Sequence, residues 1–276
     1  MRLERFPSGI MSRKNFLVVV FLMVVCSSWF AFDTGEAQAA RDGVVTVPIL
    51  LYHGIPEQSA PSQRYSVSAA RFEQQMKLLK EWGYSTISIE QLVNHLRNGH
   101  GLPTRPIVIS FDDGYQNIFD NAYPIMERYG FTGTVYIVAN RLRAEGFMNQ
   151  DELRKLVENG WEVGSHGMTH TELTQKHDLV RQEVLQSRLD INNALDIKVF
   201  SFAYPFGALD EYVASKVLDY GYSAAVGVGN LSQHSSGTTS SMSRREIQGD
   251  ASMEDFKELL PWKGRYVQPR RKYIPL

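Results

Sequence analysis

The sequence predicts a single α/β domain built on a parallel sheet. From residue 47 onward short apolar runs alternate with amphipathic segments, and no internal repeat or low-complexity linker interrupts them. Strands that alternate with helices form βαβ units, whose strands are parallel. Seven or eight such units close most simply into a (β/α) barrel, and an open doubly wound sheet is the alternative. In both architectures ligands bind at the carboxyl ends of the strands.

The strands are expected where short apolar runs lie between turn-forming residues. The run VPILLY at 47–52 is the first of these, and PIVISF at 106–111 has the same character. In chain order the predicted strands are 47–52, 84–89, 106–111, 132–138, 161–165, 199–204, 222–226 and 245–247.

The helices are expected where apolar residues recur at a spacing of three or four. Glycine follows several of these segments, as at Gly83, Gly99 and Gly130, and glycine is typical of the end of a helix. The predicted helices are 69–82, 89–98, 118–129, 151–159, 179–195, 209–220 and 253–260.

The first 39 residues differ in character from the rest. Basic side chains such as Arg2 and Arg13 precede an apolar stretch at 16–32, and the small-x-small sequence Ala-Gln-Ala follows at 37–39. This order is that of a secretory signal peptide. The apolar stretch approaches the length of a bilayer span, so a retained membrane anchor is the alternative. We therefore expect residues 40–276 to form one domain that is secreted or held at the cell surface.

Composition excludes several classes of function. The only cysteine, Cys26, lies in the apolar stretch, so residues 40–276 contain no catalytic cysteine and no cysteine metal ligand. The formal net charge of −1 gives no basic footprint, so nucleic acid is not expected as a partner. The segment at 262–276 carries basic and aromatic residues. We expect it to be a solvated tail, and contact with an anionic cell-wall polymer is the alternative.

Two adjacent carboxylates, Asp112 and Asp113, follow the predicted strand at 106–111. An isolated Asp-Asp-Gly sequence is usually a turn. Two neighbouring carboxylates can also have different roles, since one can bind a cation while the other stays free as a base. The cation then keeps both ionised despite their repulsion.

Two histidines, His166 and His170, follow the predicted strand at 161–165. Imidazoles four residues apart lie on the same side of a helical turn, as in known zinc motifs. The pair alone is a weak signal of metal binding. With Asp113 at another strand end it supplies two nitrogens and one oxygen, which is the ligand set of a catalytic metal with an open position.

Two more segments lie at strand ends. The sequence FAYPFG at 202–207 forms either a plain turn or a loop that aims a backbone N–H at an oxyanion and lines a sugar groove with aromatic rings. His53 ends the first predicted strand. A lone histidine is usually structural, but this one also lies on the expected active face.

Together these motifs resemble the polysaccharide deacetylases of carbohydrate esterase family 4, the NodB-homology group, over roughly residues 47–260. The resemblance implies a distorted (β/α)7 barrel. It also implies that Asp112 is the general base and that Asp113, His166 and His170 hold a divalent metal, Zn²⁺ first, with Co²⁺ or Ni²⁺ as alternatives. No organic cofactor is implied.

The sequence YPFG at 204–207 resembles the third motif of this family. The resemblance makes the backbone N–H of Phe206 an oxyanion donor and puts Tyr204 beside it in substrate binding. One departure is that Ala203 stands where the family has an arginine that orients the base. Arg245 is a candidate for that task.

Two further motifs of the family, Asp-x-x-Asp-Trp and the late Leu-x-His, are absent, and His234 is expected in a loop. These gaps fit the circularly permuted poly-N-acetylglucosamine deacetylases, whose acid histidine comes from an N-terminal Tyr-His segment. ILLYHGI at 49–55 resembles that segment, which makes His53 the general acid.

The resemblance implies a metal-dependent hydrolase that removes N-acetyl groups from a polysaccharide containing N-acetylglucosamine. Poly-N-acetylglucosamine, peptidoglycan and chitin-like polymers all fit, and association with the membrane or cell wall is compatible with export. An inactive carbohydrate-binding relative is the alternative that the missing motifs favour. A metallopeptidase is a third hypothesis, but the sequence lacks the HExxH helix with its glutamate base.

Overall fold

The strands form a curled parallel sheet, as the alternating pattern predicts. The computed structural model describes residues 43–58 and 63–266. Within them the main sheet has 8 strands, whose order is β10-β2-β4-β5-β6-β7-β8, with β3 paired to β4 off this path. The strands are β2 (Ile49–Tyr52), β3 (Ser85–Thr86), β4 (Pro106–Phe111), β5 (Thr134–Ile137), β6 (Glu162–Ser165), β7 (Ser201–Ala203), β8 (Ala224–Val226) and β10 (Arg245–Glu246).

A late segment of the chain joins the two edges of this path. The N–H of Met242 donates to the carbonyl of Ala225 (3.0 Å), and the N–H of Gly227 donates back to the carbonyl of Met242 (2.8 Å). A few residues later Arg245 pairs with Leu50 of β2. The sheet therefore curls into the distorted (β/α)7 barrel that was expected, rather than an open doubly wound sheet, and it forms a single domain.

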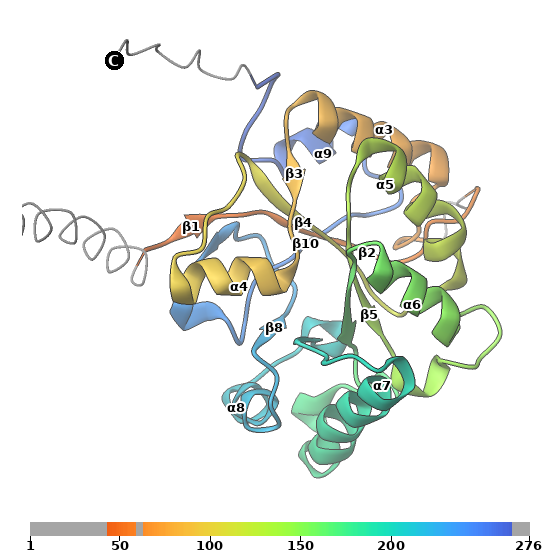
Figure 1. Cartoon of the computed structure of the whole chain (residues 1–276), viewed down its shortest axis with the longest axis vertical. Helices are drawn as coiled ribbons and strands as arrows, with labels where there is room; N and C mark the ends of the chain where they lie inside the picture. Colours follow the sequence, from red (N-terminus) through yellow and green to blue (C-terminus); the bar gives the residue numbers. More distant parts are fainter. Residues whose placement is uncertain (1–42, 59–62, 267–276) are drawn as a thin grey trace, which may run out of the picture.

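Helices surround the sheet (Figure 1). Local signals fix their ends: Ser88 and Asn149 form capping boxes, while Gly99 and Gly130 end their helices in the left-handed conformation. The helices are α3 (Ala69–Glu81), α4 (Ile89–Asn98), α5 (Tyr123–Tyr129), α6 (Gln150–Glu158), α7 (Ser187–Leu195), α8 (Glu211–Asp219) and α9 (Met253–Glu258). Short 3₁₀ turns are η2 (Ala139–Arg141), η3 (Leu173–Gln175), η4 (His177–Leu179), η6 (Pro205–Gly207) and η7 (Ser236–Thr238).

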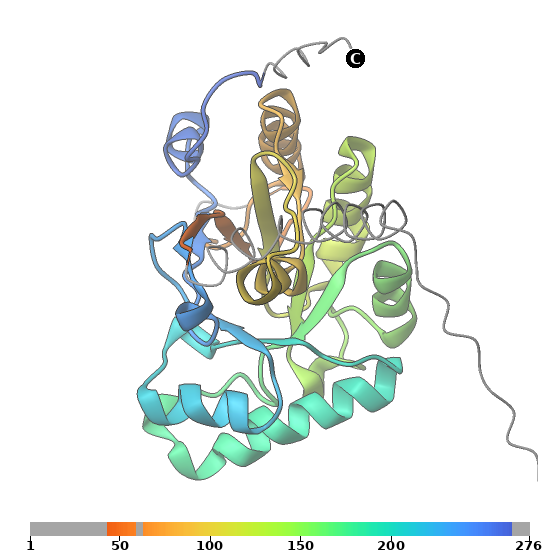
Figure 2. The ribbon, with the colours of Figure 1, turned by 60° about the vertical axis from the view of Figure 1, so that its left-hand side comes forward.

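Two helices expected as regular begin with π-helical turns. These turns are η1 (Ile118–Ala122) before α5 and η5 (Arg181–Gln186) before α7. Figure 2 shows the long helix of η5 and α7 lying beside α8. π-Helical turns are rare and occur often at functional sites.

A small antiparallel sheet was not expected. It pairs β1 (Val45–Thr46) with β9 (Gln233–His234). The expectation of a loop at His234 is thus wrong: the side chain is buried, and its Nε2 lies 3.0 Å from the carbonyl oxygen of Val47. Pairing across almost 190 residues leaves no local signal in the sequence.

The N-terminal segment interpreted as a signal peptide or anchor, residues 1–39, lies outside the described residues, as does most of the basic tail. Among the residues that the structure describes, no helix is both long enough and apolar enough to span a bilayer.

Alternate residues of the strands face two different parts of the core, as period-2 side-chain alternation requires. Val108 and Tyr136 belong to an inner cluster that α4 completes with Leu92 and Leu96. Leu50 and its equivalents on other strands pack against the remaining helices. The helix α4 thus covers one side of the inner cluster.

Gly164 of β6 lies opposite Tyr136 of β5 and gives its ring room. A Cβ atom at Gly164 would collide with the ring of Tyr136 and come within 3.0 Å of the carbonyl of Ser201. We predict that Gly164→Ala lowers the free energy of unfolding by about 1–3 kcal/mol, as overpacking does. Urea denaturation measures this. Gly101→Ala is the matched control, because a Cβ there meets no atom within 4 Å; equal midpoints for the two variants would refute the collision.

Candidate active site

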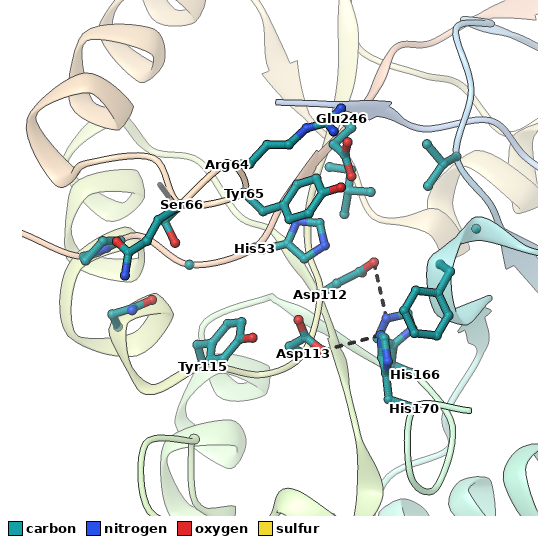
Figure 3. Close-up of a pocket in the computed structure, with 18 residues that line it drawn as sticks. His53, Arg64, Tyr65, Ser66, Asp112, Asp113, Tyr115, His166, His170 and Glu246 are labelled. Atoms are coloured by element: carbon teal, nitrogen blue, oxygen red, sulfur yellow. Dashed lines mark ion pairs between the residues drawn. The ribbon is translucent and has the colours of Figure 1, made fainter. Parts of the chain in front are cut away.

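Six of the sequence-predicted residues meet in one cavity at the carboxyl ends of the strands. Its volume is about 850 Å³, within the range of roughly 300–1,000 Å³ usual for ligand sites. Figure 3 shows His53 and Tyr65 on one wall, the two histidines on the opposite wall, and the carboxylates between them. The predicted residues that line the cavity are His53, Asp112, Asp113, His166, His170 and Phe206.

Three of these side chains form a cluster that could hold a metal ion. One ligand atom each from Asp113, His166 and His170 lie within 4.8 Å of one another. Nδ1 of His166 lies 2.8 Å from the carbonyl oxygen of Ala203, so this nitrogen donates a proton and leaves Nε2 free as a ligand. His170 Nε2 is 3.7 Å from Asp113 Oδ1. The donor chemistry and this orientation fit a divalent metal.

The backbone is strained where the site residues lie. Asp113, His170 and Phe206 adopt left-handed φ angles of 70°, 66° and 60°. Residues other than glycine adopt such angles at a cost of about 1–3 kcal/mol each, and only where the surroundings enforce them. The three strained residues lie in the segments that follow β4, β6 and β7.

Asp112 is fixed by a residue that the sequence reasoning missed. Arg244 donates from Nη1 to Oδ1 (2.6 Å) and from Nη2 to Oδ2 (2.7 Å) of Asp112, and its Nε donates to the carbonyl of Gly227 (3.0 Å). Arg244 is fully buried. Burial alone would raise the pKa of Asp112, but the charges of Arg244 and His166 and the hydrogen bonds from Arg244 outweigh it and lower the pKa to about 2.

The expectation that Arg245 orients Asp112 is therefore wrong. Arg245 donates instead to the carbonyls of Leu259 (2.6 Å) and Asn230 (2.7 Å). Neighbouring residues of a strand point to opposite faces, so only one of the two arginines can face the barrel interior. Both arginines are present in the sequence. Which of them faces the barrel interior can be decided only when the strand register is known.

His53 lies in the cavity wall opposite the two histidines (Figure 3). Its ring is 5.1 Å from the ring of Tyr65. Its positive form is one of the charges that lower the pKa of Asp112. Nδ1 is buried and has no hydrogen-bond partner within residues 43–58 and 63–266.

The two aromatic residues of the third motif separate in space. Phe206 lines the cavity, is 66% exposed, and has its ring 4.6 Å from that of His170. Tyr204 is fully buried, and its hydroxyl donates to the carbonyl of Ser240 (2.8 Å). The expected role of Tyr204 in substrate binding is wrong, because it packs with Phe202 in the core outside the cavity.

Other residues around the cavity carried no signal in the sequence. Arg64, Tyr65 and Glu246 line it near His53. Tyr115 lines it beside Asp113, and its pKa is raised by burial and by the negative charge of that carboxylate. Arg141 Nη1 lies 3.1 Å from Asp113 Oδ1. Glu246 lies on β10 and Arg141 in η2, and the others lie in loops, so their meeting at the cavity depends on tertiary contacts that no short motif specifies.

Comparisons with known proteins concern the family and the fold of the chain. Residues 100–225 match the family model for polysaccharide deacetylase. YxkH of Bacillus subtilis (strain 168) is 26% identical over 195 residues, which cover 70% of this chain and 68% of that protein. The poly-beta-1,6-N-acetyl-D-glucosamine N-deacetylase of Staphylococcus aureus (strain MRSA252) is 27% identical over 180 residues, 58% of this chain. The match spans 62% of the staphylococcal enzyme, less than two thirds of its length.

The solved structure of the Streptococcus pyogenes deacetylase PplD in complex with acetate has the same fold. It superimposes with a TM-score of 0.72 at 22% identity, over 79% of this chain and 99% of that one. The circularly permuted order that the sequence suggested stays a prediction. With its barrel, its matching segment at 100–225 and its motifs at the strand ends, the chain contains a polysaccharide deacetylase domain like that of the NodB-homology group, carbohydrate esterase family 4.

Proposed function

We propose that this chain is a metal-dependent hydrolase that removes N-acetyl groups from a polysaccharide containing N-acetylglucosamine. The observation that carries the proposal is an Asp-His-His ligand set beside a carboxylate held by a buried arginine, in one open cavity. The name of the staphylococcal relative favours poly-N-acetylglucosamine as the polymer. The charged and apolar N-terminal sequence favours action outside the cell, where such polymers occur.

Asp113, His166 and His170 would hold the divalent ion. When bound, the ion supplies Lewis acidity that polarises the acetyl carbonyl and lowers the pKa of water. Zn²⁺ suits this mixed set of nitrogen and oxygen ligands, and Co²⁺ or Ni²⁺ are the alternatives to compare.

Asp112 acts as the general base. Arg244 occupies one lone pair on each of its oxygens, which leaves the others for water in the cavity. Asp112 takes the proton of the water that attacks the amide carbon, so a C–O bond forms there. The backbone N–H of Phe206 stabilises the negative oxygen that develops.

His53 acts as the general acid from the opposite wall of the cavity. An amine is a poor leaving group until it is protonated, so cleavage of the C–N bond needs a proton donor at the nitrogen. His234, the other candidate for this role, is buried against Val47 and does not line the cavity. The products are acetate and a free amino sugar.

The inactive carbohydrate-binding relative is less well supported than the enzyme. The missing arginine at position 203 favoured it, but Arg244 makes the contact with Asp112 that the motif lacks. Acetate release from poly-N-acetylglucosamine, peptidoglycan and chitin oligomers, with and without a chelator, tests the proposal. Metal binding without acetate release would support the binding protein instead, and peptide cleavage without acetate would indicate a peptidase.

Substitutions of the two adjacent carboxylates, Asp112 and Asp113, should have different effects on metal binding and activity. Asp113→Ala should lose both metal and activity, because it removes a ligand. Asp112→Asn should keep the metal and lose about 10²–10⁴-fold in rate, as loss of one acid–base group does. Metal content by elemental analysis and acetate release by enzyme assay measure the two effects. Equal metal content in the two variants would show that the roles are assigned wrongly.

His53→Ala should keep its metal and lose kcat by about 10²–10⁴-fold on an N-acetyl substrate. On a matched O-acetyl ester the loss should be smaller, because a leaving alcohol needs less help from an acid than an amine does. The ratio of amide to ester kcat in the variant and the wild type is the measurement. Similar losses on both substrates would move the acid role away from His53.

Arg244→Lys keeps the positive charge but removes the two-pronged hydrogen bond to Asp112. We predict a fall of about 10²-fold in kcat, the effect of a base displaced by about 1 Å, with metal content unchanged. Arg245→Lys is the matched control and should leave kcat near the wild-type value, since Arg245 contacts only backbone carbonyls away from the base. A larger loss in Arg245→Lys than in Arg244→Lys would contradict the assignment.

A further inference from the structure

Glu183 is a buried carboxylate that the proposed mechanism does not use. It lies in the π-helical turn η5 and is 2% exposed. Its Oε2 accepts from the backbone N–H groups of Met168 and Thr169, both at 2.9 Å, and its Oε1 accepts from the hydroxyl of Thr169 at 2.6 Å. These two residues belong to the short segment between His166 and His170.

The same segment is held from its other side. The N–H groups of Ala139 and Asn140 donate to the carbonyls of Gly167 (3.0 Å) and Met168 (3.1 Å). With Glu183 accepting from the N–H side, the peptide groups between the two histidines are bound on both faces. The conformation of this segment therefore depends on contacts from its neighbours as well as on its own sequence.

Two local features accommodate the carboxylate. Gly167 has a φ of +84°, and a Cβ there would lie 2.9 Å from Glu183 Oε2, so glycine is needed for both reasons. The π-helical turn that carries Glu183 changes the direction in which its side chains leave the helix. Such turns occur often at functional sites.

We propose that Glu183 is a positioning residue that holds His170 against Asp113 and His166 and thereby sets the affinity of the metal site. His170 has a left-handed φ of 66°, a conformation that persists only where surrounding contacts enforce it. The N–H groups that Glu183 binds lie one and two residues before His170. This inference rests on the metal site of the proposed function.

A competing explanation is that the negative charge of Glu183 attracts the cation. Two substitutions separate charge from geometry. Glu183→Gln keeps the length of the side chain without its charge, and its carbonyl oxygen can still accept from both N–H groups. Its NH₂ group can donate to the Thr169 hydroxyl, which can turn its own proton toward the hydroxyl of Thr171, 2.8 Å away. Glu183→Asp keeps the charge but falls short of the segment by one methylene.

The experiment is a zinc titration of metal-free protein by calorimetry, without substrate. Loss of a residue that orients a ligand typically weakens metal binding about 10–100-fold, and we expect losses of this size in Glu183→Ala and Glu183→Asp. Glu183→Gln should bind zinc almost as tightly as the wild type. Acetate release at a zinc concentration near the wild-type Kd should follow the same order of variants, because the loaded fraction then follows the affinity.

Glu162 provides the matched control. It lies at the other end of β6, the strand that leads to His166, and its carboxylate also accepts from a hydroxyl, of Ser201 (2.7 Å), and from a backbone N–H, of Glu90 (3.0 Å). Glu162→Asp should leave the affinity for zinc unchanged. A loss of zinc affinity there as large as in Glu183→Asp would reduce the effect to general destabilisation and overturn the inference.

Two other results would also overturn it. One is wild-type zinc affinity in both Glu183→Ala and Glu183→Asp. The other is a large loss in Glu183→Gln with none in Glu183→Asp, which would support the charge explanation. If Glu183→Ala does not fold, the comparison of the Gln and Asp variants decides. A wild-type protein that binds zinc but releases no acetate would overturn the proposed function and leave the role of Glu183 intact.

Discussion

The buried ion pair of Arg244 and Asp112 is the interaction on which the rest of the site depends. Two charges taken out of water are stable only with close geometry and with their remaining hydrogen-bonding groups satisfied. Both carboxylate oxygens and Nε of the arginine meet that demand here. The segment that carries Arg244 is also the one that joins β8 to β2. Closure of the barrel and placement of Asp112 are therefore linked, because one segment does both.

Ala203, which stands where the third motif of the family has an arginine, still contributes to the site through its backbone. Ala203 contributes its backbone carbonyl, which accepts from Nδ1 of His166 and so leaves Nε2 for the cluster with Asp113 and His170. The contact with Asp112 comes from Arg244, which is about 40 residues later in the chain than Ala203 but close to Asp112 in space. Because chemistry depends on where a guanidinium lies rather than on its place in the sequence, a missing motif residue is weak evidence for a lost activity.

Strained backbone and buried hydrogen bonds occur together around this cavity. Asp113, His170 and Phe206 have left-handed φ angles in the segments that follow three different strands, β4, β6 and β7. Strain of this kind persists when neighbouring contacts leave no alternative, and the segment before His170 shows such contacts on both faces. A ligand set held in this way needs little rearrangement to bind a metal, which favours a rigid site over one that forms only with the ion.

The sequence by itself determined the order and nearly all the positions of the helices and main strands, because apolar periodicity and glycine stops are local signals. It also put Asp112, Asp113, His166, His170 and His53 at strand ends, which share one face of a parallel barrel. Tertiary structure decided which of Arg244 and Arg245 faces Asp112 and that Tyr204 packs in the core. A shift of one residue in strand register reverses the face of every side chain, and register is set by pairing with distant strands. The burial of His234 and the reach of Glu183 from its π-helical turn likewise follow from contacts between segments far apart in the chain, which no local pattern encodes.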